Sequence, residues 1–211
     1  MSVLKAEHVY KRIRHKEILV DINLELHSGK IYGFVGRNGS GKTMLFRALS
    51  GLINIDSGKI SFNEKTLHKD MEVLPNMGLT LENAGLYPEL TGFQNLKILS
   101  QIRKVISDVD IKQSILKVGL NPDDKRSFRK YSMGMKQRLI IAQAIMEKPD
   151  IIILDEPTNA LDEKGVIEVR NIIEEEKKRG AIILLASHNR QDIDILADHI
   201  YILNQGKIME G

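Results

Sequence analysis

Apolar and polar residues alternate along the N-terminal part of the chain. Every second residue from 20 to 26 is Val, Ile or Leu, and the residues between them are polar. A period of two is typical of a strand with one buried face. Together with residues 2–9 and 58–63, this stretch predicts a small antiparallel β layer.

Three other apolar stretches are continuous. Residues 31–36, 151–155 and 181–187 are short runs with little polar interruption, as in parallel strands that are covered on both faces. Helical segments are predicted between them, at 42–49 and 163–179. This succession of strands and helices predicts an α/β fold with a mostly parallel sheet.

The middle of the chain breaks this alternation. Thr91 followed by Gln94 resembles a capping box, and Asp110 with Gln113 is a looser version of the same pattern. Gly119 is a plausible helix C-cap. These signals predict helices in this part of the chain.

The predicted organisation is a single domain over residues 1–211. Its α/β core, with the antiparallel layer, comprises 1–82 and 147–211. A helical subdomain is predicted over 83–146.

Composition adds few constraints. Apolar residues make up 42% and charged residues 28% of the 211 positions, a mixture typical of globular proteins. The net charge of +3 is too small to indicate nucleic-acid binding. Cysteine is absent, which excludes disulfides and thiol chemistry. No stretch approaches the roughly 20 apolar residues of a membrane-spanning helix, so we expect any membrane crossing to belong to a partner.

The stretch "GRNGSGKT" matches the phosphate-loop pattern G-x-x-x-x-G-K-[ST]. A predicted strand precedes it and a predicted helix follows, which is the context that separates this motif from an ordinary glycine-rich turn. Backbone N–H groups of such a loop bind phosphate oxygens. We therefore predict nucleoside triphosphate binding by Gly36, Arg37, Asn38, Gly39, Ser40, Gly41, Lys42 and Thr43.

Two carboxylates end the buried run "IIILDEP". Asp155 is the expected Mg²⁺ partner of a phosphate-loop protein, together with the Thr43 hydroxyl. Glu156 can act as the general base that polarises the attacking water. The alternative, a surface acid before Pro157, is less favoured because the phosphate loop is present.

The stretch "YSMGMKQR" at 131–138 resembles the signature of the ATP-binding-cassette (ABC) ATPases, whose commonest form is L-S-G-G-Q followed by x-Q-R. The resemblance covers essentially the whole chain. The matching residues are Ser132, Gly134, Gln137 and Arg138. The departures are Tyr131, Met133 and Met135.

This resemblance implies that two cassettes dock head to tail. The helix start at Ser132 and Gly134 of one subunit would meet the γ-phosphate held by the phosphate loop of the other. Exposed N–H groups and a hydroxyl suit an anion. Ser132 is also an ordinary helix N-cap, and both roles can hold together.

Further motifs follow the carboxylate strand. "NALD" resembles the loop that contacts the opposite subunit in this family, but Asp162 can equally be the cap of the helix at 163. His188 stands at the position of the family's switch histidine, which contacts the γ-phosphate. Ser187 is predicted to cap the next helix.

Two positions depart from the family pattern. Ile13, with Tyr10 three residues earlier, stands where the family has an adenine-stacking aromatic residue. Glu82 replaces the usual glutamine that meets Mg²⁺ or the attacking water. Glu82 and the "YSMGMKQR" stretch together resemble the branch that exports bacitracin-type and lantibiotic peptides.

The resemblance implies an ATP-hydrolysing transporter subunit that uses Mg²⁺, pairs with a second ATPase and drives separate membrane permeases. We expect it at the cytoplasmic face of the cell membrane, without a nucleic-acid partner. Tyr87 and Pro88 lie where the permease docks in the family, or else form a simple turn. The alternatives are a non-transport cassette in DNA repair or translation, and a low-turnover ATP-gated docking module.

Overall fold

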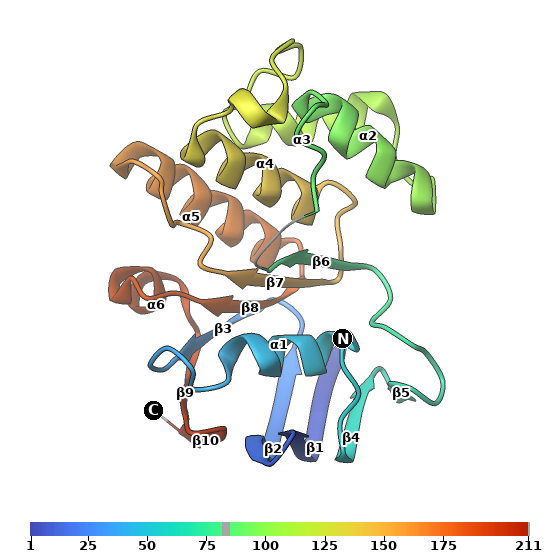
Figure 1. Ribbon diagram of the computed structural model, residues 1–211, viewed down its shortest axis with the longest axis vertical. Helices are drawn as coiled ribbons and strands as arrows, with labels where there is room; N and C mark the ends of the chain where they lie inside the picture. The colour runs from blue at the N-terminus through green and yellow to red at the C-terminus, as the bar shows by residue number, and fades with distance from the viewer. Residues whose placement is uncertain (82–84, 211) are drawn as a thin grey trace.

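Two β-sheets and a group of helices are stacked along the long axis of the molecule (Figure 1). The computed structural model describes residues 1–81 and 85–210. The antiparallel sheet lies at one end, a six-stranded sheet in the middle, and helices α2, α3 and α4 at the other end.

The antiparallel sheet confirms the predicted N-terminal layer. Its strand order is β2-β1-β4-β5. The inward-facing residues Ile22, Leu24 and Leu26 of β2 are buried, which explains the alternation in the sequence. Its strands are β1 (Val3–Ile13), β2 (Lys16–His27), β4 (Ser57–Phe62) and β5 (Lys65–Thr66).

The six-stranded sheet has the order β10-β9-β3-β8-β7-β6. All neighbouring strands run parallel except β10, which is antiparallel to β9. Its strands are β3 (Lys30–Val35), β6 (Met77–Thr80), β7 (Ile151–Asp155), β8 (Ile182–Ala186), β9 (His199–Asn204) and β10 (Lys207–Glu210).

The central strands are apolar throughout because each of their faces contacts a different core. In β7, Ile151 and Ile153 pack into the core that includes helix α1 and the antiparallel sheet. Ile152 and Leu154 pack into the second core, against the other helices. Because both faces are covered, the strand has no place for a polar side chain before Asp155.

Helix α1 lies between the two sheets, and the remaining helices lie on the opposite face of the six-stranded sheet (Figure 1). None of the helices within residues 1–81 and 85–210 is long and apolar enough to cross a membrane. The helices are α1 (Lys42–Ser50), α2 (Gly92–Arg103), α3 (Asp108–Lys117), the short 3₁₀ helix η1 (Phe128–Lys130), α4 (Met133–Ile145), α5 (Glu163–Lys178) and α6 (Arg190–Leu196).

The capping box of α2 is present as predicted: the Thr91 hydroxyl accepts from the Gln94 N–H, and the Gln94 side chain accepts from the Thr91 N–H. Helix α3 begins three residues earlier than predicted. Its N-cap is Ser107, and the Asp110 carboxylate returns to the Ser107 N–H at 2.8 Å. Asp110 therefore closes a capping box, the role that the sequence pattern predicts for Gln113.

Helix α6 shows a second correction. Ser187 is not its cap. Asn189 is the N-cap, and its side chain accepts from the Gln191 N–H at 3.0 Å. The Ser187 hydroxyl instead accepts from the Asn189 N–H at 3.1 Å, so it holds the turn that leads into the helix.

Candidate functional site

The predicted phosphate loop connects β3 to the N-terminus of α1. Gly39 and Gly41 have φ values of +76° and +110°, which side-chain-bearing residues rarely adopt. A Cβ atom on Gly36 would lie 2.3 Å from the carbonyl oxygen of Leu203. The glycines are therefore required for a tight loop whose backbone leads into a helix N-terminus, a site suited to phosphate.

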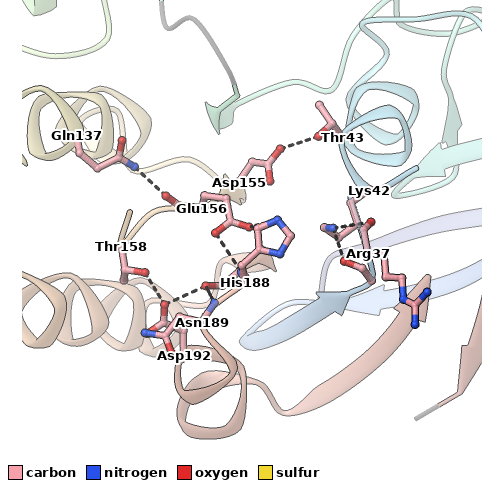
Figure 2. Close-up of polar contacts among 12 residues, drawn as sticks. Arg37, Lys42, Thr43, Gln137, Asp155, Glu156, Thr158, His188, Asn189 and Asp192 are labelled. Carbon is pink, nitrogen blue, oxygen red and sulfur yellow. Dashed lines mark hydrogen bonds and ion pairs between the residues drawn. The ribbon is translucent and has the colours of Figure 1, made fainter. Parts of the chain in front are cut away.

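Lys42 is folded back onto this loop. Its side chain is largely buried, and its Nζ donates to the carbonyl oxygen of Gly36 at 2.7 Å (Figure 2). The buried Oγ of Ser40 has no hydrogen-bond partner among the described residues. A cation and an unsatisfied hydroxyl in one glycine-rich cradle fit the phosphate groups of a nucleotide.

Thr43 and Asp155 supply oxygen atoms beside the loop. The Thr43 hydroxyl donates to Oδ2 of Asp155 at 2.9 Å (Figure 2), and the Asp155 N–H donates to the Thr80 hydroxyl at 3.1 Å. No group of three or more His, Cys, Asp or Glu in residues 1–81 and 85–210 is arranged to hold a metal. A hydroxyl and one carboxylate suit Mg²⁺ that completes its coordination with phosphate oxygens.

Glu156 and His188 face each other across the ends of β7 and β8. The His188 N–H donates to Oε2 of Glu156 at 3.0 Å, and His188 Nε2 lies 3.5 Å from Oε1 (Figure 2). That Oε1 atom is buried and accepts no hydrogen bond within the described residues. Glu156 has a φ of +53°, an uncommon conformation for this residue type. An underused carboxylate oxygen beside an imidazole can accept a proton from water.

Gln137 ties helix α4 to this pair. Its Nε2 donates to the carbonyl oxygen of Glu156 at 3.1 Å (Figure 2). The same Nε2 also donates to the carbonyl oxygen of Pro157 at 3.1 Å. In the sequence, Gln137 is recognisable only as a residue that matches one position of the signature motif. Its spacing from Glu156 along the chain gave no sign of this contact.

The loop, the acids and the histidine border one pocket of about 730 Å³. Gly36 and Arg37, at the start of the loop, do not line it. The lining residues are Lys16, Ile18, Asn38, Gly39, Ser40, Gly41, Lys42, Thr43, Met44, Thr80, Leu81, Gln137, Ile140, Asp155, Glu156, Asn159 and His188.

Other predicted site residues lie outside this pocket. Ile13 is 43% exposed at the end of β1 and pairs with Lys16, which does line the pocket. Asp162 caps α5 by accepting from the Gly165 N–H at 3.0 Å. Its side chain is also largely exposed. The predicted metal ligand Glu82 lies outside the described residues.

The signature residues Ser132 and Gly134 also lie outside the pocket. Ser132 is the N-cap of α4 and accepts from the Met135 N–H at 3.2 Å. A Cβ atom on Gly134 would be 3.1 Å from the carbonyl oxygen of Ala160, so this helix start packs closely on the "NALD" segment. Met133, between them, is 70% exposed.

This is a P-loop NTPase-type fold, because a glycine-rich loop at the carboxyl end of the parallel strand β3 leads into a helix. The family model described as ABC transporter matches residues 19–159. The ABC transporter ATP-binding protein YybJ of Bacillus subtilis (strain 168) is 49% identical over 206 residues, which are 98% of this chain and 94% of YybJ. The chain belongs to the ABC transporter family, which confirms the resemblance seen in its motifs.

Two further relatives carry transport names. The bacitracin transport ATP-binding protein BcrA of Bacillus licheniformis is 38% identical over 211 residues, which are 99% of this chain and 69% of BcrA. The lantibiotic transport ATP-binding protein SrtF of Streptococcus pyogenes is 37% identical over 207 residues, or 98% of this chain and 89% of SrtF.

A solved dimeric structure of a bacterial ABC transporter cassette matches the fold with a TM-score of 0.87 at 20% identity. The match covers 98% of this chain and 97% of the solved chain. The predicted fold class is confirmed.

Proposed function

We propose that this chain is the ATP-hydrolysing subunit of an ABC transporter, and that it acts as a pair of cassettes with Mg²⁺. The observation that carries the proposal is the pocket in which Lys42, Asp155, Glu156 and His188 meet. These residues lie at the ends of two neighbouring strands, β7 and β8, and at the start of helix α1, as expected for a site at the carboxyl edge of a parallel sheet.

Lys42 and the loop N–H groups would bind the β- and γ-phosphates. Thr43 and Asp155, which are in contact, would hold Mg²⁺. Bound Mg²⁺ would neutralise charge on the two phosphates. The sequence adds Glu82 as a further proposed ligand.

Glu156 would act as the general base. Its buried Oε1 would accept a proton from the attacking water while the water oxygen bonds to the γ-phosphorus and the bond from that phosphorus to the bridging oxygen breaks, so that ADP leaves with the bridging oxygen. His188 would orient that water and contact the γ-phosphate, because its imidazole is already held beside the carboxylate.

We propose that Ser132, Gly134 and Asp162 act on the pocket of a second cassette. All three lie outside the pocket of their own chain. The helix start at Ser132 offers N–H donors to an anion. Ile13, beside the pocket-lining Lys16, is our proposed contact for the base through dispersion.

The names of BcrA and SrtF support transport over DNA repair or translation, and suggest an antimicrobial peptide as cargo. Membrane permeases would carry that peptide, with this subunit at their cytoplasmic side. The proposed helical subdomain, 83–146, would receive the permease near Tyr87 and Pro88. Tyr87 is 55% exposed, while its backbone is held by two hydrogen bonds with Asn95.

Two substitutions test the proposal. Lys42→Ala should abolish nucleotide binding or turnover. Glu156→Gln should retain ATP binding but lose about 10²- to 10⁴-fold in turnover. Phosphate release and equilibrium binding of ATP measure the two effects separately.

Asp194→Asn is a matched control, because this exposed acid of α6 pairs only with the exposed Arg190 among the described residues. It should behave as wild type. Unchanged hydrolysis in Lys42→Ala would refute the phosphate site, and normal turnover in Glu156→Gln would identify another base. A wild-type protein that binds ATP without turnover would favour the docking-module alternative.

A further inference from the structure

A fully buried carboxylate lies behind the Glu156–His188 pair. Asp192, in the first turn of α6, has no exposed surface and does not line the nucleotide pocket. Its Oδ1 accepts from Nε and Nη2 of Arg170 at 2.8 and 2.6 Å. Its Oδ2 accepts from the hydroxyls of Thr158 at 2.5 Å and Ser187 at 3.1 Å (Figure 2). One carboxylate therefore joins α5, α6 and the segments that follow β7 and β8.

Stability alone is a weak explanation for this arrangement. A buried ion pair must overcome the loss of hydration of both charges, and apolar side chains of similar volume often stabilise a core equally well. The Asp192 carboxylate is completely satisfied, with four donor contacts from three residues. A fully satisfied network of this kind also rigidifies its members, because each hydrogen bond fixes a distance and a direction between them.

The two hydroxyl donors stand next to the proposed catalytic residues. Thr158 follows Glu156 by two residues, and Ser187 directly precedes His188. The Ser187 hydroxyl also accepts from the Asn189 N–H, so it holds the backbone on the other side of His188. Both hydroxyls converge on the same Oδ2 atom. A shift of either segment therefore disturbs the position of the other.

We propose that Asp192 is a positioning residue for ATP hydrolysis, which keeps Glu156 and His188 in register through Thr158 and Ser187. The effect of Asp192 on the kcat for ATP hydrolysis rests on the proposed function. Its structural consequence, the contact between the His188 N–H and Glu156 Oε2 at 3.0 Å, does not require turnover. Asp192 touches neither catalytic side chain through any of its four side-chain contacts.

The test is Asp192→Asn, which keeps the shape but replaces one acceptor oxygen by an N–H donor. Hydrogen exchange of the His188 amide, followed by NMR, should become faster in the variant. The kcat for ATP should fall about 10- to 100-fold, because a misplacement on the order of 1 Å suffices for such a loss. The KM should stay within about twofold, since Lys42 and the phosphate loop, which would supply most of the binding to the nucleotide, are not changed.

Thr158→Val and Ser187→Ala remove one hydroxyl each and carry the test if Asp192→Asn does not fold. Each removes one hydrogen bond to Asp192 and should speed exchange at His188 and lower kcat about 2- to 10-fold. Ser187→Ala also removes the acceptor of the Asn189 N–H, so Thr158→Val is the cleaner of the two variants. Asp194→Asn, the exposed acid on the same helix, should change neither.

Unchanged His188 exchange in the folded variants would overturn the proposal, as would a wild-type kcat in both Asp192→Asn and Thr158→Val. A parallel rise in KM and fall in kcat would also overturn it, because general loosening of the fold would then explain the loss. If the wild-type protein does not hydrolyse ATP, the proposed function fails, while the exchange measurement still decides whether Asp192 positions the pair.

Discussion

The link between helix α4 and the Glu156–Pro157 segment can be broken without leaving a cavity. Gln137→Met keeps the length of the side chain and most of its volume but removes the amide that donates to Glu156 and Pro157. The change therefore isolates two hydrogen bonds from packing effects. We expect the variant to fold, to bind ATP and to hydrolyse it more slowly.

The size of the effect follows from what each carbonyl loses. The Glu156 carbonyl also accepts from the Asn159 N–H at 3.2 Å and stays partly satisfied, whereas the Pro157 carbonyl loses the Gln137 donor. With a net value of about 0.5–1.5 kcal/mol per hydrogen bond, the unfolding free energy should fall by about 1–2 kcal/mol. For a domain of this size, the Tm should fall by about 2–8 °C.

Helix α4 supplies its own control. Gln143 is also half-buried, but its Oε1 has no hydrogen-bond partner among the described residues. Gln143→Met removes this unsatisfied atom, so it should leave the Tm unchanged or raise it. Circular dichroism melts give the Tm of both variants. Phosphate release at saturating ATP gives kcat, which should fall about tenfold only in Gln137→Met.

Two outcomes would refute this reasoning. If Gln137→Met melts and turns over like the wild type, the contacts of Gln137 with the Glu156 segment carry no energy in solution. If Gln143→Met is destabilised as much as Gln137→Met, the loss comes from placing methionine on α4 and not from the missing donors.

Three further predictions concern other parts of the chain. Burial favours a higher pKa for Asp198, but hydrogen bonds from Lys177 and from the Ile31 N–H outweigh burial and lower that pKa. The ionised Asp198 therefore stabilises the fold at pH values above the ordinary aspartate pKa. This stabilisation is lost as the pH falls through the lowered pKa of the folded state. Urea unfolding between about pH 3 and pH 7 should show Asp198→Asn less stable at neutral pH and the difference shrinking in acid; a constant difference would contradict this. Gly78→Ala places a Cβ 1.8 Å from the Ala144 carbonyl oxygen and should lower the unfolding free energy by about 1–3 kcal/mol or more, which an unchanged urea midpoint would disprove. Glu82→Gln should give equal or faster basal ATPase, because it removes negative charge proposed to lie beside the γ-phosphate; a large loss of phosphate release would show that the carboxylate has a positive role.

The sequence predicted those elements whose burial leaves a clear pattern. Strands β3, β7 and β8 are covered on both faces, so each is a continuous apolar run that predicts a buried parallel strand. Strand β6 was not predicted, since its four residues include Gly78 and hold their place by pairing with β7. The start of α3 was predicted three residues too late. Both Ser107 and Asp110 are residue types that cap helices, and the sequence alone favoured Asp110, whereas the structure has Ser107 as the N-cap.

At the site, local motifs identified the phosphate loop and the residues at strand ends. Contacts that depend on tertiary structure could not be read in the same way. Gln137 and the carbonyls it binds are about twenty residues apart on different elements, and the Asp192 network joins residues from α5, α6 and two loops. Neither arrangement leaves a periodic or motif-like trace, because only the folded sheet brings these segments together.

The central claim is that each ATP site is built from two chains, and mixing two inactive variants tests it most directly. Lys42→Ala disables the phosphate loop. Ser132→Asp keeps a good N-cap for α4 but places a negative charge where the γ-phosphate would bind. Each variant alone should be almost inactive in phosphate release.

An equal mixture should recover about a quarter of the wild-type rate, because half of the randomly formed pairs would contain one intact site of two. Recovery at that level requires Ser132 of one chain to serve Lys42 of the other. A mixture that stays inactive, or a Ser132→Asp protein that hydrolyses ATP at the wild-type rate by itself, would contradict the two-chain site.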